Sequence, residues 1–382
     1  MKILIAPDKF KGSLSAQAVC IALSKGLKKN NPNLKIITLP MADGGDGSLE
    51  VLAHYFDLKT IEIAVHDPLW RPIKAAYKMA GTTAYIELSA ASGLVLLKEE
   101  ERNCMETSSV GTGELILDAL RKGAKQIYLF IGGSATNDGG MGIAHALGFA
   151  FFAKNGDLLK PVGKNLRLIE EIDKEDLWFD LKGIKFKVIC DVNNPFYGEN
   201  GAAYVYAPQK GATSEEVKEL DKGLRHLAKL LKAANYADIA AISGAGAAGG
   251  VGGGAIAFLG AELVAGIQTF ITLTQLEAAI KDCDLVITGE GKLDSQTEQG
   301  KVISGVCELA RKYDKRVIAV CGAADFPIPK LLGLQEVYTV LSKSESITEA
   351  MEKAAAKLEL IGREIGTQFN EIKKGKGRGS KA

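Results

Sequence analysis

The sequence has 382 residues, of which 47% are hydrophobic and 24% charged, and this balance excludes a mainly disordered chain. Lys and Arg total 47 and Asp and Glu total 46, so the formal net charge of +1 gives no support for a nucleic-acid or membrane-surface function. Glycine is abundant, with 43 residues against 10 prolines, which indicates loops with special backbone geometry rather than a low-complexity chain.

Short apolar runs alternate with helical patterns from the first residues onward. Helical spacing predicts a helix over residues 16–27, with Ser13 or Ser15 as its N-cap, and a second helix over 48–55. Strands are predicted at residues 2–6, 35–39, 126–131, 186–190, 284–288, 316–320 and 336–341. Strands that alternate with helices in this way predict an α/β protein with a parallel sheet.

The middle of the chain has a different pattern. Two alternating runs flank Gly81-Thr82 within residues 73–88, and residues 149–159 surround Asn155-Gly156, so hairpins are predicted at both places. This shift indicates domain boundaries near residues 62 and 282. The basic segment 373–382 is interpreted as a frayed terminus.

The cysteines and histidines predict neither a disulfide framework nor a zinc site. The six cysteines form no CxxC pair, and the four histidines have no metal-ligand spacing. No apolar run approaches the roughly 18 residues of a membrane span, and the N-terminal segment meets a carboxylate at Asp8 too early for a signal peptide. We therefore expect a cytoplasmic protein.

Two charged loops follow the first two predicted strands. Residues 6–15 gather Asp8, two lysines and two hydroxyls at a helix N-terminus, which favours an anion, although a capped helix with solvated lysines explains them equally well. Residues 40–48 place Asp43 and Asp46 among three glycines. This pair can supply oxygen ligands to Mg²⁺, whereas Asp46 as a helix N-cap is the structural alternative.

Two glycine-rich loops lie in the middle of the chain. Residues 132–142 combine five glycines with short polar side chains and can aim backbone amides at phosphate or carboxylate oxygens. Residues 244–254 contain a GxGxxG pattern, with Glu262 at the distance expected for a ribose carboxylate, which raises a dinucleotide-binding oxidoreductase as a rival interpretation. The helix-like residues 232–242 precede it, however, where that fingerprint requires a strand, and no Walker A motif is present.

Two further segments follow predicted strands. Residues 190–198 contain Asp191 and Asn193, which can bind a metal or a substrate, or can form an Asx-turn before a proline. Residues 284–301 place two carboxylates and a lysine after a strand, as in a phosphoryl-transfer site. Acidic groups, anion-binding loops and lysines without an obvious covalent nucleophile indicate phosphoryl transfer.

Together, these segments resemble the motifs of the type 1 glycerate kinases, a bacterial family, over about residues 1–366. The resemblance rests on APDKFKGSLSA at 6–16, ADGGDG at 42–47, GGSATNDGGMGIAHALG at 132–148, CDVNNPFYGENGAA at 190–203, GAGAAGGVGGG at 244–254 and DLVITGEGKLDSQTEQGK at 284–301. Because these motifs occur together and in order, the resemblance is far more specific than any one of them.

The resemblance implies an ATP:D-glycerate phosphotransferase that uses Mg²⁺ and forms 2-phosphoglycerate and ADP. 3-Phosphoglycerate is the alternative product, and an oxidoreductase acting on a small hydroxy acid is a remote alternative. The implied partners are the small molecules ATP and D-glycerate, without nucleic acid or membrane. The oligomeric state stays open between monomer and homodimer.

The resemblance also implies two α/β domains with a cleft between them. One is discontinuous and comprises residues 1–62 and 283–370. The other is flavodoxin-like and comprises the inserted residues 63–282. Residues 371–382 form a basic flexible tail. The two points at which the chain passes from one domain to the other, near residues 62 and 282, agree with the shift in pattern described above.

Local chemistry in the matched segments assigns hypothetical roles. Asp191 or Asp294 acts as the base or orients the acceptor, while Lys11 and Lys301 offset phosphate charge. The metal candidates are Asp8, Asp43, Asp46 and Glu290. Arg71 can pair with the glycerate carboxylate, or is a surface arginine after a turn. The other candidates for binding substrate or phosphate are Ser13, Gly132, Gly133, Ser134, Thr136, Asn137, Asp138, Asn193, Gly244, Gly246, Gly249 and Gly250.

Overall fold

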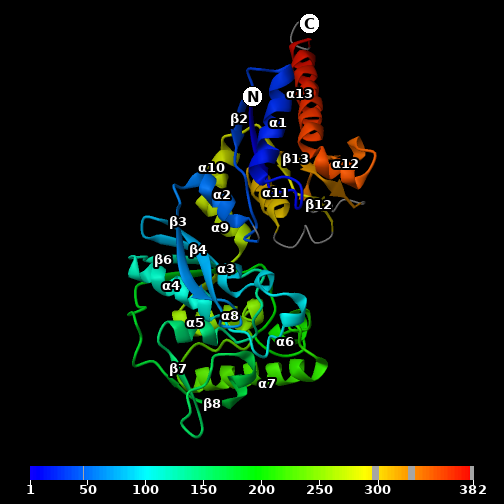
Figure 1. The fold of residues 1–382 in the computed structure, drawn as a ribbon. Coiled ribbons are helices and arrows are strands. Elements are labelled where there is room, and N and C mark those ends of the chain that lie inside the picture. Colours follow the sequence, from blue (N-terminus) through cyan, green and yellow to red (C-terminus); the bar gives the residue numbers. More distant parts are fainter. Residues whose placement is uncertain (46, 295–300, 326–331, 379–382) are drawn as a thin grey trace. The chain divides into compact units, whose positions relative to one another are not determined.

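The computed structural model describes residues 1–45, 47–294, 301–325 and 332–378, with side chains up to residue 368. Contacts divide the chain into two compact units. The end unit comprises Met1–Tyr55 and Ala265–Ala382, and the middle unit comprises Phe56–Val264. Figure 1 follows the chain from the blue N-terminal part through the green middle unit to the red C-terminal helix.

A five-stranded parallel sheet forms the centre of the end unit. Its strand order is β15-β13-β11-β1-β2, and Ile5 of β1 lies between Ile287 of β11 and Thr38 of β2. The strands are β1 (Lys2–Pro7), β2 (Lys35–Thr38), β11 (Leu285–Gly289), β13 (Arg316–Cys321) and β15 (Glu336–Thr339), and β12 (Lys292–Leu293) pairs separately with β14 (Ala323–Ala324). The helices are α1 (Ala16–Asn30), α2 (Ser48–Tyr55), α9 (Gly266–Leu273), α10 (Leu276–Lys281), α11 (Val302–Lys312), α12 (Ile347–Glu352) and α13 (Ala354–Arg378).

Helices α1 and α13 lie side by side although they come from opposite ends of the chain (Figure 1). Leu23 and Leu27 of α1 are fully buried in the same core as Leu358 of α13, and each such burial contributes roughly 1.5–3 kcal/mol. The crossing is close, because a Cβ at Gly26 would lie 2.1 Å from the backbone oxygen of Glu359. Of the two predicted caps, Ser13 and Ser15, the structure has Ser15, whose hydroxyl accepts from the Ala18 amide at 3.2 Å.

The middle unit is built on a six-stranded mixed sheet in the order β10-β9-β6-β5-β4-β3. Its strands are β3 (Lys59–His66), β4 (Pro72–Ala80), β5 (Thr83–Glu87), β6 (Gln126–Phe130), β9 (Lys185–Ile189) and β10 (Glu262–Val264), with β7 (Ala150–Ala153) and β8 (Ile169–Asp173) as a separate pair. The helices are α3 (Ser89–Ser92), α4 (Val110–Arg121), α5 (Met141–Ala146), α6 (Ala202–Tyr206), α7 (Ser214–Ala233) and α8 (Ala247–Leu259). Short 3₁₀ turns occur at Leu94–Leu96, Glu99–Glu101, Gly163–Leu168 and Pro208–Lys210, and in the end unit at Leu341–Lys343.

Both hairpins predicted in the middle of the chain are present in the structure. Strands β4 and β5 pair antiparallel around Gly81, which has a φ of +56°, so the first hairpin is confirmed. Around Asn155-Gly156 the chain also reverses: an antiparallel bridge joins Phe152 to Leu158, and the Leu159 amide donates to the Phe151 carbonyl at 2.8 Å. The second hairpin is thus present as a short one, and the longer strand β7 also pairs with β8.

The α/β class is confirmed, but the flavodoxin-like arrangement occurs in the other unit. In sequence order the end-unit sheet reads 2-1-3-4-5, which is the flavodoxin-like order. The middle unit instead joins parallel neighbours β5, β6, β9 and β10 to an antiparallel β4 and β3. The resemblance implied a flavodoxin-like domain in the middle of the chain without specifying a strand order. The observed order shows that this arrangement belongs to the end unit.

The contact division runs at residues 55/56 and 264/265. Strand β3 pairs with β4 along its whole length from Lys59, so residues 59–62 belong with the middle unit. Near the second boundary, α9 packs closely against α11. A Cβ at Gly305 of α11 would lie 2.4 Å from the side chain of Ile267 in α9. The domain limits at residues 62 and 282 stay predictions from the sequence.

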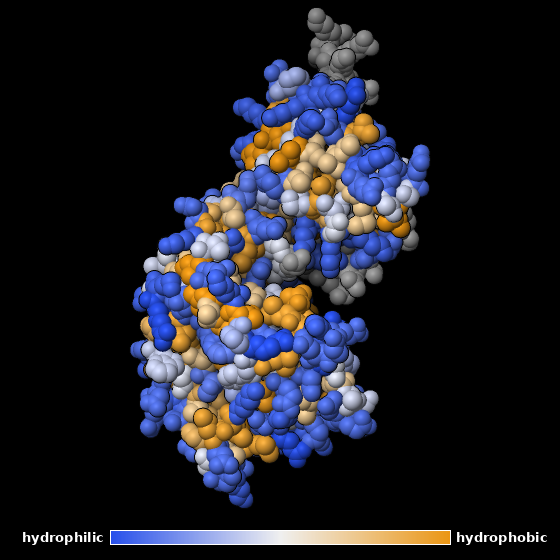
Figure 2. Space-filling model, in the orientation of Figure 1, coloured by the Kyte–Doolittle hydropathy of each residue, from blue (hydrophilic) through white to orange (hydrophobic). Residues whose placement is uncertain are grey.

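Hydrophilic residues cover much of the face shown in Figure 2, and hydrophobic residues form separate patches between them. Each of the six cysteines is a free thiol, as the lack of paired spacing predicted. In the described part of the chain, no helix combines the length and apolarity that a membrane crossing requires.

Candidate functional site

A pocket of about 760 Å³ opens at the carboxyl ends of the end-unit strands. Strand β1 continues to β2 on one side, whereas β11, β13 and β15 extend the sheet on the other side. The strand order therefore reverses between β1 and β11, and in open α/β sheets ligands bind at this switch point. The amide of Asp8, after β1, donates to the carbonyl of Gly289 at the end of β11 (2.8 Å), which fixes the two loops together.

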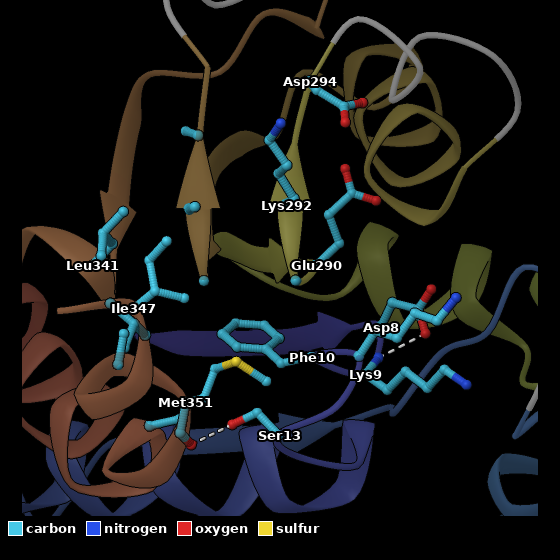
Figure 3. Close-up of a pocket in the computed structure, with 18 of the residues that line it drawn as sticks. Asp8, Lys9, Phe10, Ser13, Glu290, Lys292, Asp294, Leu341, Ile347 and Met351 are labelled. Atoms are coloured by element: carbon cyan, nitrogen blue, oxygen red, sulfur yellow. Dashed lines mark hydrogen bonds between the residues drawn. The ribbon is translucent and has the colours of Figure 1, made fainter.

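Seven of the predicted site residues line this pocket. They come from loops after three different strands: Asp8, Lys11 and Ser13 after β1, Asp43 after β2, and Glu290, Asp294 and Lys301 after β11. Figure 3 shows Asp8, Glu290 and Asp294 on the charged side of the pocket. Asp46 lies outside the described residues.

Two glycines allow the backbones beneath the pocket to lie in close contact. A Cβ at Gly289 would lie 1.8 Å from the backbone oxygen of Val320, and one at Gly322 would lie 2.4 Å from the oxygen of Gly291. Any larger residue would push these backbones apart. Gly289, the last residue of β11, and Gly322, which follows β13, thus serve the geometry of the pocket floor.

Carboxylates lie close enough in the pocket to repel one another. Burial, together with the nearby charges of Asp43 and Glu290, raises the pKa of Asp8 from 3.8 to about 7. The Lys9 amide donates to Asp8 Oδ1 at 2.6 Å and partly opposes this rise. A cation bound beside Asp8 would relieve the repulsion and hold the carboxyl in its ionised form.

The donor set of this corner fits Mg²⁺. The ion prefers oxygen ligands, retains several waters and usually takes only one or two carboxylates from the protein. Asp8, Asp43 and Glu290 supply carboxylate oxygens facing one space. Among the residues with described placement, no three acidic, His or Cys side chains are close enough to ligate one ion together. The fit is therefore to an ion held by few direct protein ligands.

Lysines accompany these carboxylates. Lys301 Nζ lies 4.0 Å from Asp294 Oδ1, and both side chains are less than a third exposed. Lys292 Nζ lies 2.9 Å from Asp325 Oδ2 at an exposed position. Positive groups beside carboxylates can contact phosphate oxygens while the carboxylates hold a metal or accept a proton.

The glycine-rich segments 132–142 and 244–254 pack on each other within the middle unit. The Gly139 amide donates to the Gly249 carbonyl at 3.0 Å. A Cβ at Gly249 would lie 1.9 Å from the Thr136 carbonyl oxygen, one at Gly246 would lie 2.2 Å from the Pro195 oxygen, and one at Gly250 would lie 3.0 Å from the Gly139 Cα. Close backbone packing thus accounts for these glycines. Gly132 and Gly133 are exposed at the end of β6, and Gly244 has a φ of +85°.

Asp138 holds the starts of two helices. Its Oδ2 accepts from the amide and hydroxyl of Ser109 at 2.7 Å and from the Gly142 amide at 3.1 Å, and its Oδ1 accepts from the Gly140 amide at 3.1 Å. Ser109 and Gly140 are the N-cap residues of α4 and α5. Burial raises the pKa of Asp138, while these donors favour its ionised form.

A buried lysine supports the same loop. Lys210 is only 2% exposed, and its Nζ donates to the Thr136 carbonyl at 2.7 Å and to Ser134 Oγ at 3.3 Å. Burial lowers the pKa of this lysine to about 8. Neighbouring Asn137 is fully buried, and neither polar side-chain atom has a hydrogen-bond partner. The sequence carries no signal for Lys210, which lies in a short turn without periodic pattern.

Three remaining candidates lie at other places in the middle unit. Asp191 and Asn193 are exposed after β9, and Asn193 Oδ1 accepts from the hydroxyl of Ser243 at 3.0 Å. Arg71 Nε donates to Asp67 Oδ2 at 2.5 Å and Nη1 donates to Glu101 Oε1 at 2.6 Å. The guanidinium of Arg71 is thus already paired with two carboxylates of its own unit.

The structure also brings apolar residues into the pocket that the sequence analysis did not single out. Figure 3 shows Phe10, Leu341, Ile347 and Met351 opposite the charged side chains. The spacing of the exposed Ile347 and Met351, at the i and i+4 positions of a short helix, could have indicated this apolar surface from the sequence. A hydrophobic pair spaced by four residues lies on one helix face.

A doubly wound α/β unit with carboxylates and lysines at its switch point defines a class of enzymes that bind phosphorylated ligands. Residues 3–370 match the Glycerate kinase family. The chain is 43% identical to Glycerate 2-kinase of Escherichia coli (strain K12), over 93% of this chain and 94% of the relative, and 39% identical to Glycerate kinase of Bacillus subtilis (strain 168), over 98% and 99%. A solved structure assigned as glycerate kinase 2 from Salmonella typhimurium LT2 matches with a TM-score of 0.87 at 38% identity, covering 98% of this chain and 99% of that one. The chain belongs to the glycerate kinase family.

Proposed function

We propose that this protein is an ATP-dependent kinase that phosphorylates the C2 hydroxyl of D-glycerate and forms 2-phosphoglycerate and ADP. Family membership supports the kinase reaction, and the name of the Escherichia coli relative supports the 2-position. One structural observation carries the proposal furthest. Acidic and basic residues from loops far apart in the sequence meet in one pocket at the switch point of the sheet.

The reaction joins the hydroxyl oxygen of glycerate to the γ-phosphorus of ATP and breaks the bond between that phosphorus and the β–γ bridging oxygen. In the proposal Asp294 accepts the hydroxyl proton, because it lies beside a lysine at the pocket. Lys301 and Lys11 offset the charge that spreads over the transferred phosphoryl group. Asp191 is the alternative group for orienting the acceptor.

The proposal assigns the metal to the acidic corner of the pocket. Asp8, Asp43 and Glu290 would hold Mg²⁺, directly or through water, and Asp46 stays a further candidate. A bound Mg²⁺ would supply positive charge that offsets the negative charge developing on the phosphate oxygens. The raised pKa of Asp8 supports this assignment, because a crowded carboxyl group gains most from a nearby cation.

Polar residues at the strand ends of the middle unit stay further candidates for binding a substrate. Asn193, Gly132 and Gly133 are exposed residues whose amide groups can donate to a carboxylate or a hydroxyl group. The proposed partners are small molecules only, and the net charge of +1 is consistent with this. We further propose that the protein acts in the cytoplasm, where its nucleotide substrate is formed.

The experiment that tests the reaction class is a measurement of ADP release with and without D-glycerate, in Mg²⁺ and in EDTA. We expect ADP to form only when ATP, Mg²⁺ and glycerate are all present. Glycerate-dependent reduction of NAD⁺ or NADP⁺ in place of ADP release would instead establish the oxidoreductase alternative. ATP hydrolysis at a rate that does not depend on glycerate would contradict the proposed acceptor.

A further inference from the structure

The pocket of the end unit has an apolar half that phosphoryl transfer does not require. Phe10 is buried at its floor, whereas Ile347 is 68% exposed and Met351 is 44% exposed. Val340, Leu341, Ala350 and Ala354 also line this side. Figure 3 shows Ile347 and Met351 turned toward the ring of Phe10, with the charged groups on the opposite side.

Local structure holds this apolar wall in place. The hydroxyl of Ser346 accepts from the Glu349 amide at 3.1 Å and caps α12, so Ile347 and Met351 project from one face of the helix. On the other side, a tight turn after β1 presents Phe10, whose carbonyl accepts from the Ser13 amide at 2.8 Å. Two segments more than 300 residues apart therefore form one apolar surface.

We propose that this apolar half binds the adenine and ribose of ATP, with the triphosphate extending to the lysines and carboxylates of the other half. The inference rests on the proposed function and identifies the part of the pocket that receives the nucleotide base. An adenine ring has two apolar faces and gains affinity from contact with Phe, Ile and Met side chains. Glycerate carries an oxygen on every carbon, so it gains little from such a wall.

The size and polarity of the pocket agree with a nucleotide. Its volume of about 760 Å³ lies within the roughly 300–1,000 Å³ of small-molecule sites, in which apolar walls and a few placed charges are the rule. Phe10 leads directly along the chain to Lys11, which lines the same pocket. A ligand with one apolar end and one anionic end matches this division.

The competing location is the pair of glycine-rich segments in the middle unit. There the backbones of residues 132–142 and 244–254 pack against each other, so the space beside Gly249 and Gly250 is already filled by protein. To enter there, a nucleotide base would have to separate the buried backbones around Gly139 and Gly249. The end-unit pocket requires no such opening.

The test compares nucleotide binding in Ile347→Ala, Met351→Ala and the double variant with a matched control, Ile21→Ala. Ile21 is 58% exposed on α1 and lies outside the pocket lining. Equilibrium titration with the non-hydrolysable analogue AMP-PNP and Mg²⁺ measures Kd without turnover. We expect Kd to rise about threefold to tenfold in each single variant and more in the double variant. Ile21→Ala should bind as the wild type does.

Steady-state kinetics and photolabelling provide further readouts. In the double variant the KM for ATP should rise in step with Kd, while the KM for glycerate stays within about twofold. Labelling the wild-type protein with 8-azido-ATP should modify the peptide that contains residues 341–354. Labelling of residues 132–142 or 244–254, or an unchanged Kd in the double variant, would overturn the inference.

These outcomes separate the two proposals. If the wild type turns over glycerate but the double variant binds AMP-PNP normally, the base subsite is refuted and the kinase stands. If the labelled peptide is the expected one but no glycerate-dependent turnover occurs, the base subsite stands and the proposed function fails.

Discussion

The hydroxyl of Ser13 donates a 2.6 Å hydrogen bond to the backbone carbonyl of Met351, which lies 338 positions further along the chain. The bond joins the turn after β1 to α12, so both chain ends shape one wall of the pocket (Figure 3). Ser13 was predicted as a phosphate-binding residue, and that role stays a proposal beside this structural one.

Replacing Asp294 by Asn should lower kcat by about 10²-fold or more, because a general base contributes roughly 10²–10⁴-fold. The matched control is Asp284→Asn, which changes the same residue type at the opposite end of β11, where Asp284 is 64% exposed. The control should retain nearly full activity, and both variants should unfold at nearly the wild-type temperature.

Asp191→Asn measured beside Asp294→Asn decides between the two candidate bases. We expect the larger loss of kcat in Asp294→Asn, since Asp294 lines the pocket together with Lys301. Wild-type turnover in Asp294→Asn, with a large loss in Asp191→Asn, would move the proton-accepting role to the middle unit.

Arg71→Ala should lower thermal stability and leave the KM for glycerate nearly unchanged. The side chain of Asp67 is 2% exposed, and removing its guanidinium partner leaves a buried carboxylate with only backbone donors. Thermal unfolding and steady-state kinetics on the same preparation check both parts. A tenfold increase in the KM for glycerate at unchanged stability would instead support carboxylate binding by Arg71.

Gly249→Ala should destabilise the protein by about 2–5 kcal/mol. The residue has a φ of +70°, and its new Cβ would meet the Thr136 oxygen, so left-handed strain and overpacking add together. Gly156→Ala is the control, with a φ of +85° but nothing within 4 Å of the added Cβ, and should cost only about 1–2 kcal/mol. Equal losses in urea unfolding would show that packing between the glycine-rich segments is unimportant.

The buried Lys210 predicts a pH dependence of stability. Its pKa is about 8 in the folded protein, against 10.5 for the ordinary side chain. Between these values the unfolded chain binds a proton that the folded chain has lost, so stability increases as pH rises from about 8 to 10.5. The shift corresponds to on the order of 3 kcal/mol.

Lys210→Met tests this dependence, because methionine keeps most of the side-chain length and cannot titrate. The free energy of unfolding of the wild type should increase relative to the variant between pH 7.5 and pH 10. A difference between the two proteins that does not change with pH would contradict the assignment of a depressed lysine pKa.

Local patterns predicted much of the α/β class and the strand–helix alternation. The predicted strands at residues 2–6, 126–131 and 316–320 correspond to β1, β6 and β13, because buried parallel strands read as continuous apolar runs. The strand order could not be read in this way. Order depends on which strand edges pair in three dimensions, so the flavodoxin-like arrangement was assigned to the wrong unit.

The sequence indicated which types of residue the candidate site contains more readily than where in the fold they lie. Asp8, Asp43 and Glu290 were predicted as metal candidates because charged residues follow apolar runs, and the fold brings them to one pocket. The glycines at 249 and 250 looked equally functional, but their small size is explained by backbone packing. Glycine patterns alone do not separate close approach to a ligand from close approach to another segment.

The most direct test of the central claim couples the reaction to enolase, which consumes 2-phosphoglycerate and not its 3-isomer. With Mg²⁺, ATP and D-glycerate, we predict an immediate enolase-dependent signal whose rate equals that of ADP release. A signal that appears only after phosphoglycerate mutase is added would contradict phosphorylation at C2 and assign the phosphate to C3.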